Sequence, residues 1–540
     1  MKTPPRPRSP FTFVATACVI LIAVSGLSPA AEPEIPFPPL SPEMPYDVDM
    51  AQKSALEKKQ QFAHVQRLFD IYSWQTFIAL NWPIDDQGKP QKSITAESRH
   101  FWETYIESFQ VYKEDGSGPV NPNPPYDYGT VKGYPNDYAP ERGERLLTMN
   151  FQKNIPARIS SRKSRGVVAD ETLQAFSGPL IDQNGKWVRY EVLMNEPEYD
   201  YVVQNQFYNL DGQLLFSNAG KQVNFPSGMN KDGLNRPPLP EPKRGAMELK
   251  LSWKELGKGD IQSRFLRVKA MIEDADGSWH KKEMGLVGMH IAVKTESSPT
   301  WVWATFEHVD NVRINDFLAD PGVDGNAPKA PSFYDPNQPT KTVNVLPTPT
   351  GKDASGNPTW DISKVTYPVQ VTRVIPIPVA KEVLNSEVQG ILGKAGSVLR
   401  YYELIDTQWP TGTDPKTGTS PLTPAVPPGT PINFNAPNAI ANKAPGDITP
   451  TFLTNSTMET YFQTGNQPAT NEEEGSSFDI TPIFATESCT GCHYSAGIVT
   501  RSFKNASNAN QAIFGASGNG DFSWLMAQKA KWLKSSKTAK

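Results

Sequence analysis

Five residues near the end of the chain constrain its fold most: Cys489-Thr490-Gly491-Cys492-His493. Two thiols three residues apart fall on one face of a helical turn, with the imidazole beside them. This spacing is the attachment sequence of a c-type haem, in which two thioether bonds hold the porphyrin edge and a histidine reaches the iron. The motif therefore predicts one covalent haem on Cys489 and Cys492, with His493 as the proximal iron ligand.

The N-terminus has the three-part layout of a secretory signal peptide. Residues 1–8 carry three positive charges, residues 11–24 are apolar apart from two threonines, and Ser28 and Ala30 are placed for cleavage. The apolar run is too short to span a bilayer comfortably. We therefore expect residues 1–30 to be removed together with Cys18, and the mature chain to be periplasmic or secreted.

The mature chain then keeps two of the three cysteines, both in the motif. A zinc finger would need a second pair of ligands, and no further Cys or close His is available. A redox dithiol fits the two-residue spacing and the export. However, nothing around the motif looks like a thioredoxin unit, and the dithiol leaves His493 unexplained. Export and motif are independent features, and both agree with haem.

Charge limits the partners that the chain is expected to bind. The signal peptide removes three of the 53 basic residues and none of the 57 acidic ones, which leaves a net charge of −7. This balance argues against nucleic acid and against an anionic membrane surface, and it suits docking to a basic redox partner protein. Because no other long apolar stretch is present after the signal peptide, we predict no transmembrane helix in the mature chain.

Proline and glycine set the expected domain boundaries. The 51 prolines and 38 glycines favour a loop-rich β protein over a helical bundle. We expect a Pro-rich arm at 31–48, a helix plus a β-rich domain at 49–409, and a Pro-rich linker or strap at 410–450. A haem module would occupy 451–540. The predicted fold class is α+β, with a large antiparallel, sandwich-like domain, flanking helices and a small helical C-terminal module.

Helical periodicity predicts two longer helices, at residues 50–80 and 379–402. A short helix at 456–462 would begin with Ser456 and Glu459 as a capping pair. Asp521 could cap a final helix that contains Met526.

Alternating hydrophobicity after residue 180 predicts antiparallel strands. Asn184-Gly185 and Asp211-Gly212 each lie between strand-like runs, which is a strong hairpin signal. Residues 247–253 and 266–273 alternate apolar and polar side chains, so we expect one buried and one wet face. Further strands are predicted at three ranges: 285–294, 301–309 and 366–375.

The hairpin of residues 285–309 carries a second group of candidate residues. If its turn centres near Pro299, His290 and His308 stand opposite each other on one face. Either could be the sixth ligand of the iron, or both could bind a separate metal with Glu307 or Asp310. They could also be a structural pair bonded to carbonyls or carboxylates. A register slip of one residue would separate the two histidines.

The single exported motif resembles that of mono-haem c-type cytochromes. This resemblance implies a cytochrome c-like fold for the C-terminal module and a downstream Met as the ligand on the far side of the iron. Met526 is the only methionine after His493, but it falls inside a predicted helix, where it would serve core packing. The stretches 73–83, 301–311 and 407–410 also resemble those of long exported bacterial proteins of the cytochrome c family.

We therefore expect an exported mono-haem c-type cytochrome that acts in electron transfer, with the β-rich domain as a scaffold or docking surface. The alternative is a haem-dependent oxidoreductase for peroxide, oxygen or a small organic substrate. Its β-rich domain would form the substrate site, with Glu307, His290 or His308 as the acid–base group. A further alternative is a metal-binding or structural β domain with a tethered cytochrome.

Overall fold

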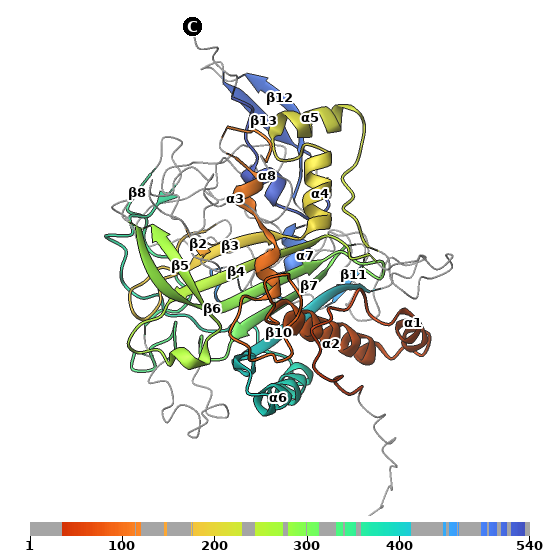
Figure 1. Cartoon of the computed structure of the whole chain (residues 1–540). Helices are drawn as coiled ribbons and strands as arrows, with labels where there is room; N and C mark the ends of the chain where they lie inside the picture. Colours follow the sequence, from red (N-terminus) through yellow and green to blue (C-terminus); the bar gives the residue numbers. More distant parts are fainter. Residues whose placement is uncertain are drawn as a thin grey trace, which may run out of the picture. The chain divides into compact units, whose positions relative to one another are not determined.

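An antiparallel sheet organises the part of the chain that the computed structural model describes (Figure 1). The described residues are 35–113, 115–119, 145–147, 174, 177–228, 243–273, 279–298, 300–312, 331–338, 341–352, 358–411, 447–449, 453–461, 463, 488–493, 496–504, 509–515 and 520–534. In spatial order, the main path of the sheet is β1 (Ile106–Glu107), β3 (Arg189–Met194), β4 (Met247–Glu255), β6 (Trp279–Val293), β7 (Val302–His308), β10 (Tyr402–Thr411) and β11 (Asp447–Thr449). Beside it, β5 (Arg267–Glu273) pairs with the first half of β6, and β2 (Arg145–Leu147) runs parallel to β5.

The strands predicted from alternation at 247–253, 266–273, 285–294 and 301–309 are confirmed as β4, β5, β6 and β7. Each pairs antiparallel with a neighbour. The turn at Asn184-Gly185 is also confirmed, because Gly185 adopts φ +75° and Val188 N donates to Leu180 O at 2.9 Å across it. Glycine reaches this left-handed conformation without a steric penalty.

Two helices cover one face of the sheet: α2 (Phe62–Leu80) and α6 (Val379–Lys394), with α1 (Met50–Lys58) packed on α2. Phe77 of α2 stacks on Phe306 of β7 with ring centroids 4.1 Å apart. The single helix predicted over 50–80 is wrong at its centre, because Gln60 adopts φ 60° between α1 and α2 and a right-handed helix cannot continue through that conformation.

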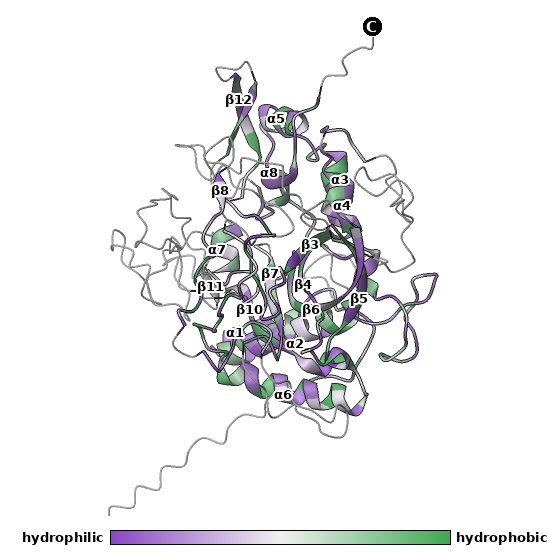
Figure 2. Cartoon of the chain, turned by 90° about the vertical axis from the view of Figure 1, so that its left-hand side faces the viewer, coloured by the Kyte–Doolittle hydropathy of each residue, from purple (hydrophilic) through white to green (hydrophobic). Residues whose placement is uncertain are grey.

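The second predicted helix, 379–402, also ends earlier than expected. α6 carries hydrophobic and hydrophilic residues in turn, as its colours show (Figure 2), and it stops at Lys394, followed by Gly396 at φ +72°. Glycine in this conformation commonly terminates helices. The short helix η5 (Val398–Tyr401) comes next, and Tyr402 then begins β10, a strand that we did not predict.

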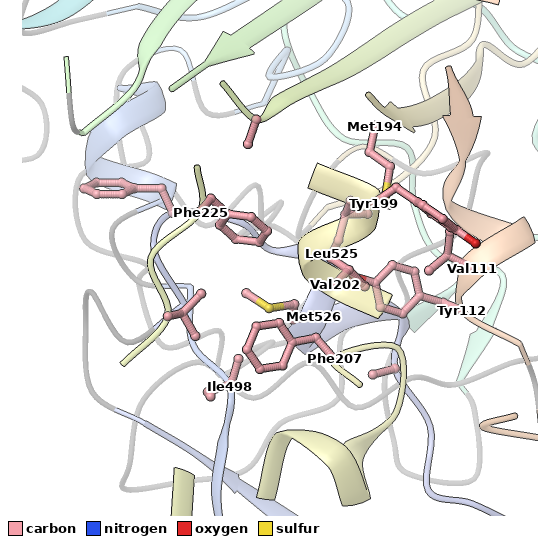
Figure 3. Packing of buried hydrophobic residues seen from close by; sticks show 14 of the residues in the cluster. Val111, Tyr112, Met194, Tyr199, Val202, Phe207, Phe225, Ile498, Leu525 and Met526 are labelled. Atoms are coloured by element: carbon pink, nitrogen blue, oxygen red, sulfur yellow. The ribbon is translucent and has the colours of Figure 1, made fainter. Parts of the chain in front are cut away.

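On the other face of the sheet, α4 (Glu196–Gln204) packs against β4, and α5 (Leu210–Asn218) packs with elements from the C-terminal end. The latter are α8 (Leu525–Lys529) and the hairpin of β12 (Val499–Lys504) and β13 (Asn510–Phe514). Their apolar side chains form one cluster (Figure 3), in which Phe207, Ile498 and Met526 are fully buried. The helices between β3 and β4 and the elements from the C-terminal end are therefore packed into one core.

The hairpin predicted around Asp211-Gly212 is wrong, because α4 and α5 occupy this region. Asn195 and Asn209 cap the two helices, since their side chains accept from Glu198 N at 3.2 Å and from Gly212 N at 2.7 Å. Such caps satisfy backbone donors that the first turn leaves unpaired. Capping and packing thus outweigh the turn preference of the Asp-Gly pair.

The expected α+β class, with an antiparallel sheet and flanking helices, is confirmed, but the sandwich is wrong for the described residues. Apart from the principal sheet, they contain only the two-stranded pairs β12–β13 and β8 (Gly351–Lys352) with β9 (Pro358–Thr359). In those ranges there is also no separate haem module, because the described residues from Phe37 onward belong to one compact unit.

Two predictions fall outside the described residues: the signal peptide at 1–30 and most of the linker, 412–446. Three others are wrong. Residues 366–375 form no strand, residues 456–461 form a turn, and Asp521 does not cap α8, because the N-cap residue of that helix is Trp524. The remaining short elements are η1 (Phe101–Thr104), α3 (Ser108–Val111), η3 (Gln262–Arg264) and α7 (Cys489–His493). Among the described residues, no helix combines the length and apolar character needed to cross a bilayer.

Candidate functional site

The Cys-x-x-Cys-His motif lines a pocket on the face of the sheet that points away from α2. The pocket encloses about 960 Å³ of space, part of it open to solvent. Its walls come from three sources: strands β3, β4, β6 and β7, the segment 453–459, and the helices α7 and α8.

Side chains from neighbouring strands form the floor of the pocket. Lys250 of β4 lies directly opposite His290 of β6, and Ala292 of β6 lies opposite Trp303 of β7. Since side chains alternate between faces along a strand, these residues point away from α2. The face of β4 that we expected to be wet is therefore covered, and Ser252 on it is fully buried.

Helix α7 carries the motif and is fixed to the sheet by Gln408 of β10. The Gln408 amide donates to Ser488 Oγ at 3.0 Å and accepts from Thr490 N at 2.7 Å. Ser488 O in turn accepts from Cys492 N at 2.9 Å. Because one side chain holds the start of the helical turn, both thiols and the imidazole face the pocket together.

His493 is oriented as a metal ligand would be. Its Nδ1 lies 2.7 Å from Phe522 O; a carbonyl can only accept, so Nδ1 carries the proton and Nε2 keeps its lone pair. The ring packs on Trp303 with centroids 4.4 Å apart. Burial lowers the pKa of His493 to about 4. The imidazole is therefore neutral at physiological pH, as metal ligation requires.

The surroundings of Cys489 do not favour the thiolate that a redox dithiol needs. Cys489 and Cys492 are not joined in a disulfide. Burial, followed by the charges of Glu459 and Cys492, raises the pKa of Cys489 well above its ordinary value. A catalytic dithiol needs a lowered thiol pKa, because the thiolate is the nucleophile. The donor set of two thiols and one neutral imidazole in a largely apolar pocket fits a c-type haem.

A second histidine, His290, faces the same pocket and is paired with a carboxylate. His290 Nε2 lies 2.9 Å from Glu459 Oε1, and Glu459 Oε2 accepts from Asn455 N at 2.8 Å. Burial raises the pKa of Glu459, but its interactions with His290 and Lys250 and the hydrogen bond from Asn455 N together outweigh burial, so the pKa lies below its ordinary value. The other ring nitrogen, Nδ1, is buried with no hydrogen-bond partner among the described residues.

His308 does not stand opposite His290. The partner of His290 across the hairpin is Thr305, so His308, three residues on, points to the other face. Its Nε2 lies 3.0 Å from Arg264 O, and its Nδ1 accepts from Asp310 N at 3.2 Å. Burial lowers its pKa to about 3. Both nitrogens are occupied, so His308 is a structural residue in this arrangement.

The acidic candidates near this hairpin are paired with arginines. Glu307 forms an ion pair with Arg373 at 2.7 Å and accepts from Ser456 N at 2.7 Å. Asp310 binds Arg264 through two hydrogen bonds of 2.7 Å. Within the described ranges, no three His, Cys, Asp or Glu side chains come together as a metal site.

Met526 lies in the hydrophobic cluster beside the pocket, not in its lining. Its side chain is fully buried next to Phe207 and Ile498 (Figure 3), and its carbonyl accepts from Gln213 Nε2 at 2.8 Å. Packing of this kind is the usual role of an interior methionine.

Sequence reasoning missed several residues of the site: Lys250, Trp303, Gln408 and Glu459. Lys250 was predicted to face solvent, because alternation reports which residues share a face but not which elements cover that face. Glu459 was treated as part of a helix cap. No local signal links Gln408 to the motif, which begins 81 residues later in the chain.

Comparison of the chain with protein-family models, with curated proteins and with solved structures found no match. The function is therefore inferred from the chemistry and geometry of the site itself.

Proposed function

We propose that this chain is an exported mono-haem c-type cytochrome that acts in electron transfer. Cys489 and Cys492 would hold the haem covalently, and His493 would be its proximal iron ligand. The observation that carries the proposal is the orientation of the motif, in which α7 turns both thiols and a neutral imidazole toward one pocket. When bound there, haem supplies reversible one-electron chemistry.

The residues around the motif perform the tasks that such a cofactor needs. Phe522 O fixes the His493 tautomer, and the hydrogen bond to Nδ1 raises the basicity of Nε2 toward a metal. Trp303 limits the rotation of the imidazole. Apolar side chains such as Val192 and Leu453 line the pocket, and an apolar lining favours the less charged state of a redox centre.

The second candidate function is a haem-dependent oxidoreductase with a small substrate. The observation that favours it is the group of polar side chains on the pocket wall, Glu248, Lys250 and Glu459, which electron transfer alone does not require. In that case the pocket would admit substrate, and one of these groups would move a proton.

Attachment can be tested by producing the protein in a host that exports it and attaches haem outside the cytoplasmic membrane. The wild-type protein should keep haem through denaturation and acid–organic extraction. The Cys489→Ala, Cys492→Ala double variant should release all of it, because no thioether remains. Cys18→Ala is the matched control, since Cys18 lies in the predicted signal peptide and should have no effect. Haem that stays attached in the double variant would refute the assignment.

Two further parts of the proposal concern the environment of the protein. We propose that it is periplasmic or secreted, and that it exchanges electrons with a partner protein whose docking surface is basic, since the predicted mature chain has a net charge of −7. Slower electron exchange at higher salt would support this electrostatic docking, whereas a rate independent of salt would contradict it.

A further inference from the structure

We infer that His290, held by Glu459, is the second axial ligand of the iron, and that it binds through Nδ1. This inference depends on the proposed covalent haem and extends it, because it names a second protein residue that would bind the iron beside His493.

The first support is location. The sequence contains six histidines, and only His290 and His493 line the pocket. His308 is engaged on the other face of the sheet, and His100 is bonded to Glu103 at 3.1 Å. In the part of the chain that the structure describes, no methionine lines the pocket. Apart from His493, His290 is therefore the histidine that is available to bind the iron.

The second support is the hydrogen-bond pattern of the ring. A carboxylate can only accept, so His290 Nε2 donates to Glu459 Oε1. Nδ1 of a neutral imidazole then keeps a lone pair, yet it is buried without a hydrogen-bond partner in the described residues. A buried polar atom that is left unpaired is costly, and a metal ion would satisfy it. A ligand histidine with its second nitrogen bonded to a carboxylate is the usual arrangement at metal sites.

The third support is that the Glu459 segment is built to hold this pair in position. Asn455 N donates to the second Glu459 oxygen at 2.8 Å, and the Asn455 amide donates to Thr305 Oγ1 at 2.8 Å. Thr305 lies directly opposite His290. The segment is thus fixed to the strand next to His290, so Glu459 can select which ring nitrogen is free.

The test is spectroscopy of the purified ferric protein. We expect the wild type to give the optical and spin-resonance signals of low-spin iron with two imidazoles. His290→Ala should keep its covalent haem but become high-spin, and added imidazole should restore the low-spin signal. His280→Ala is the matched control, because His280 is exposed on the same strand and its loss should change neither signal.

A conservative variant covers the case in which His290→Ala does not fold. Glu459→Gln keeps the ligand but weakens the hydrogen bond that gives the imidazole anionic character, which stabilises ferric iron. Its reduction potential should therefore rise while the haem stays low-spin. A wild type with covalent haem that is high-spin, or a His290→Ala protein that remains low-spin, would overturn the inference and leave the attachment proposal intact. A wild type without haem would overturn both.

Discussion

Two buried carboxyls, Glu248 on the pocket wall and Glu198 near it, have pKa values that are raised above the ordinary value of glutamate. Both oxygens of Glu198 are buried without a hydrogen-bond partner in the described residues. Burial, followed by the charge of Glu248, raises the pKa of Glu198 well above 4.5. Burial also raises the pKa of Glu248 to about 7, although Ser523 donates to it at 3.0 Å. Both carboxyls are therefore protonated in the folded protein at mildly acidic pH.

Because these two pKa values are higher in the folded protein than in the unfolded chain, the stability of the fold depends on pH. Since the folded-state pKa values lie above those of the unfolded chain, the carboxyls contribute fully below about pH 4.5, and their contribution is lost as pH rises toward 7. Glu198→Gln removes one of these groups. We expect its free energy of unfolding to exceed that of the wild type by a margin that grows by up to about 1.4 kcal/mol per pH unit between pH 5 and 7. Denaturant unfolding across this range measures the margin.

The control for this prediction is Glu196→Gln, because Glu196 is exposed on the same helix, α4. Its margin should not change with pH. A constant margin for Glu198→Gln as well would contradict the assignment of a protonated Glu198.

At the residue scale the sequence predicted part of the site. The motif placed Cys489, Cys492 and His493 together within five residues, and all three line one pocket; their attachment to haem stays a prediction. His290 was only one of several candidates in the sequence. Its position in the pocket depends on the register of β6 and β7, and its hydrogen bond depends on Glu459, 169 residues away. Side chains brought together by such long-range packing leave no local pattern.

At the scale of elements, Gly288 of β6 allows the segment 453–461 to approach the sheet. A Cβ at this position would lie 2.5 Å from Thr457 Oγ1 and 2.6 Å from Ser252 Oγ. Those two hydroxyls bond to each other at 2.8 Å. The close approach of strand and segment therefore requires glycine.

We expect Gly288→Ala to lower the free energy of unfolding by about 1–3 kcal/mol, the usual cost of overpacking a buried site. It should also shift the haem absorption spectrum, because the displaced segment carries Glu459. The control is Gly390→Ala in α6, where a Cβ meets no atom within 4 Å. That change should stabilise the protein by about 1 kcal/mol, since alanine favours helix. A Gly288→Ala protein as stable as the wild type would show that the segment does not pack there.

The elements that the sequence predicted well are those whose pattern and packing agree. Apolar and polar side chains alternate along β4 because one of its faces is buried in the core. Apolar residues recur at helical spacing in α2 because one side of the helix packs on the sheet, where Phe77 stacks on Phe306. The failures have physical causes. Asp211-Gly212 forms no hairpin turn, because the Asn209 side chain caps a helix there. We did not predict β10, because both of its faces are buried and its sequence therefore shows no alternation.

At the scale of the whole molecule, the C-terminal residues that the structure describes pack into the sheet core, and those residues show no separate cytochrome domain. α8 and β12 share a hydrophobic cluster with α4 and α5, and Gln408 holds the start of α7. The boundary predicted at 410–450 came from ten prolines. Proline content reports local flexibility or extension, however, and not how the residues after the proline-rich stretch pack.

This packing predicts a shared unfolding transition. Thermal unfolding measured by haem absorbance, which reports α7 and the pocket, should coincide with unfolding measured by far-ultraviolet circular dichroism, which reports the sheet. Haem absorbance that changes at least several degrees below the main transition would contradict a common core.

The central claim is that this exported chain carries one haem bound through its last two cysteines. The most direct measurement is the intact mass of the denatured, exported wild-type protein. We expect the mass of the polypeptide without residues 1–30 plus one haem, with fragment ions that place the addition on the peptide containing Cys489 and Cys492. A bare polypeptide, with these thiols free or joined to each other, would contradict the account.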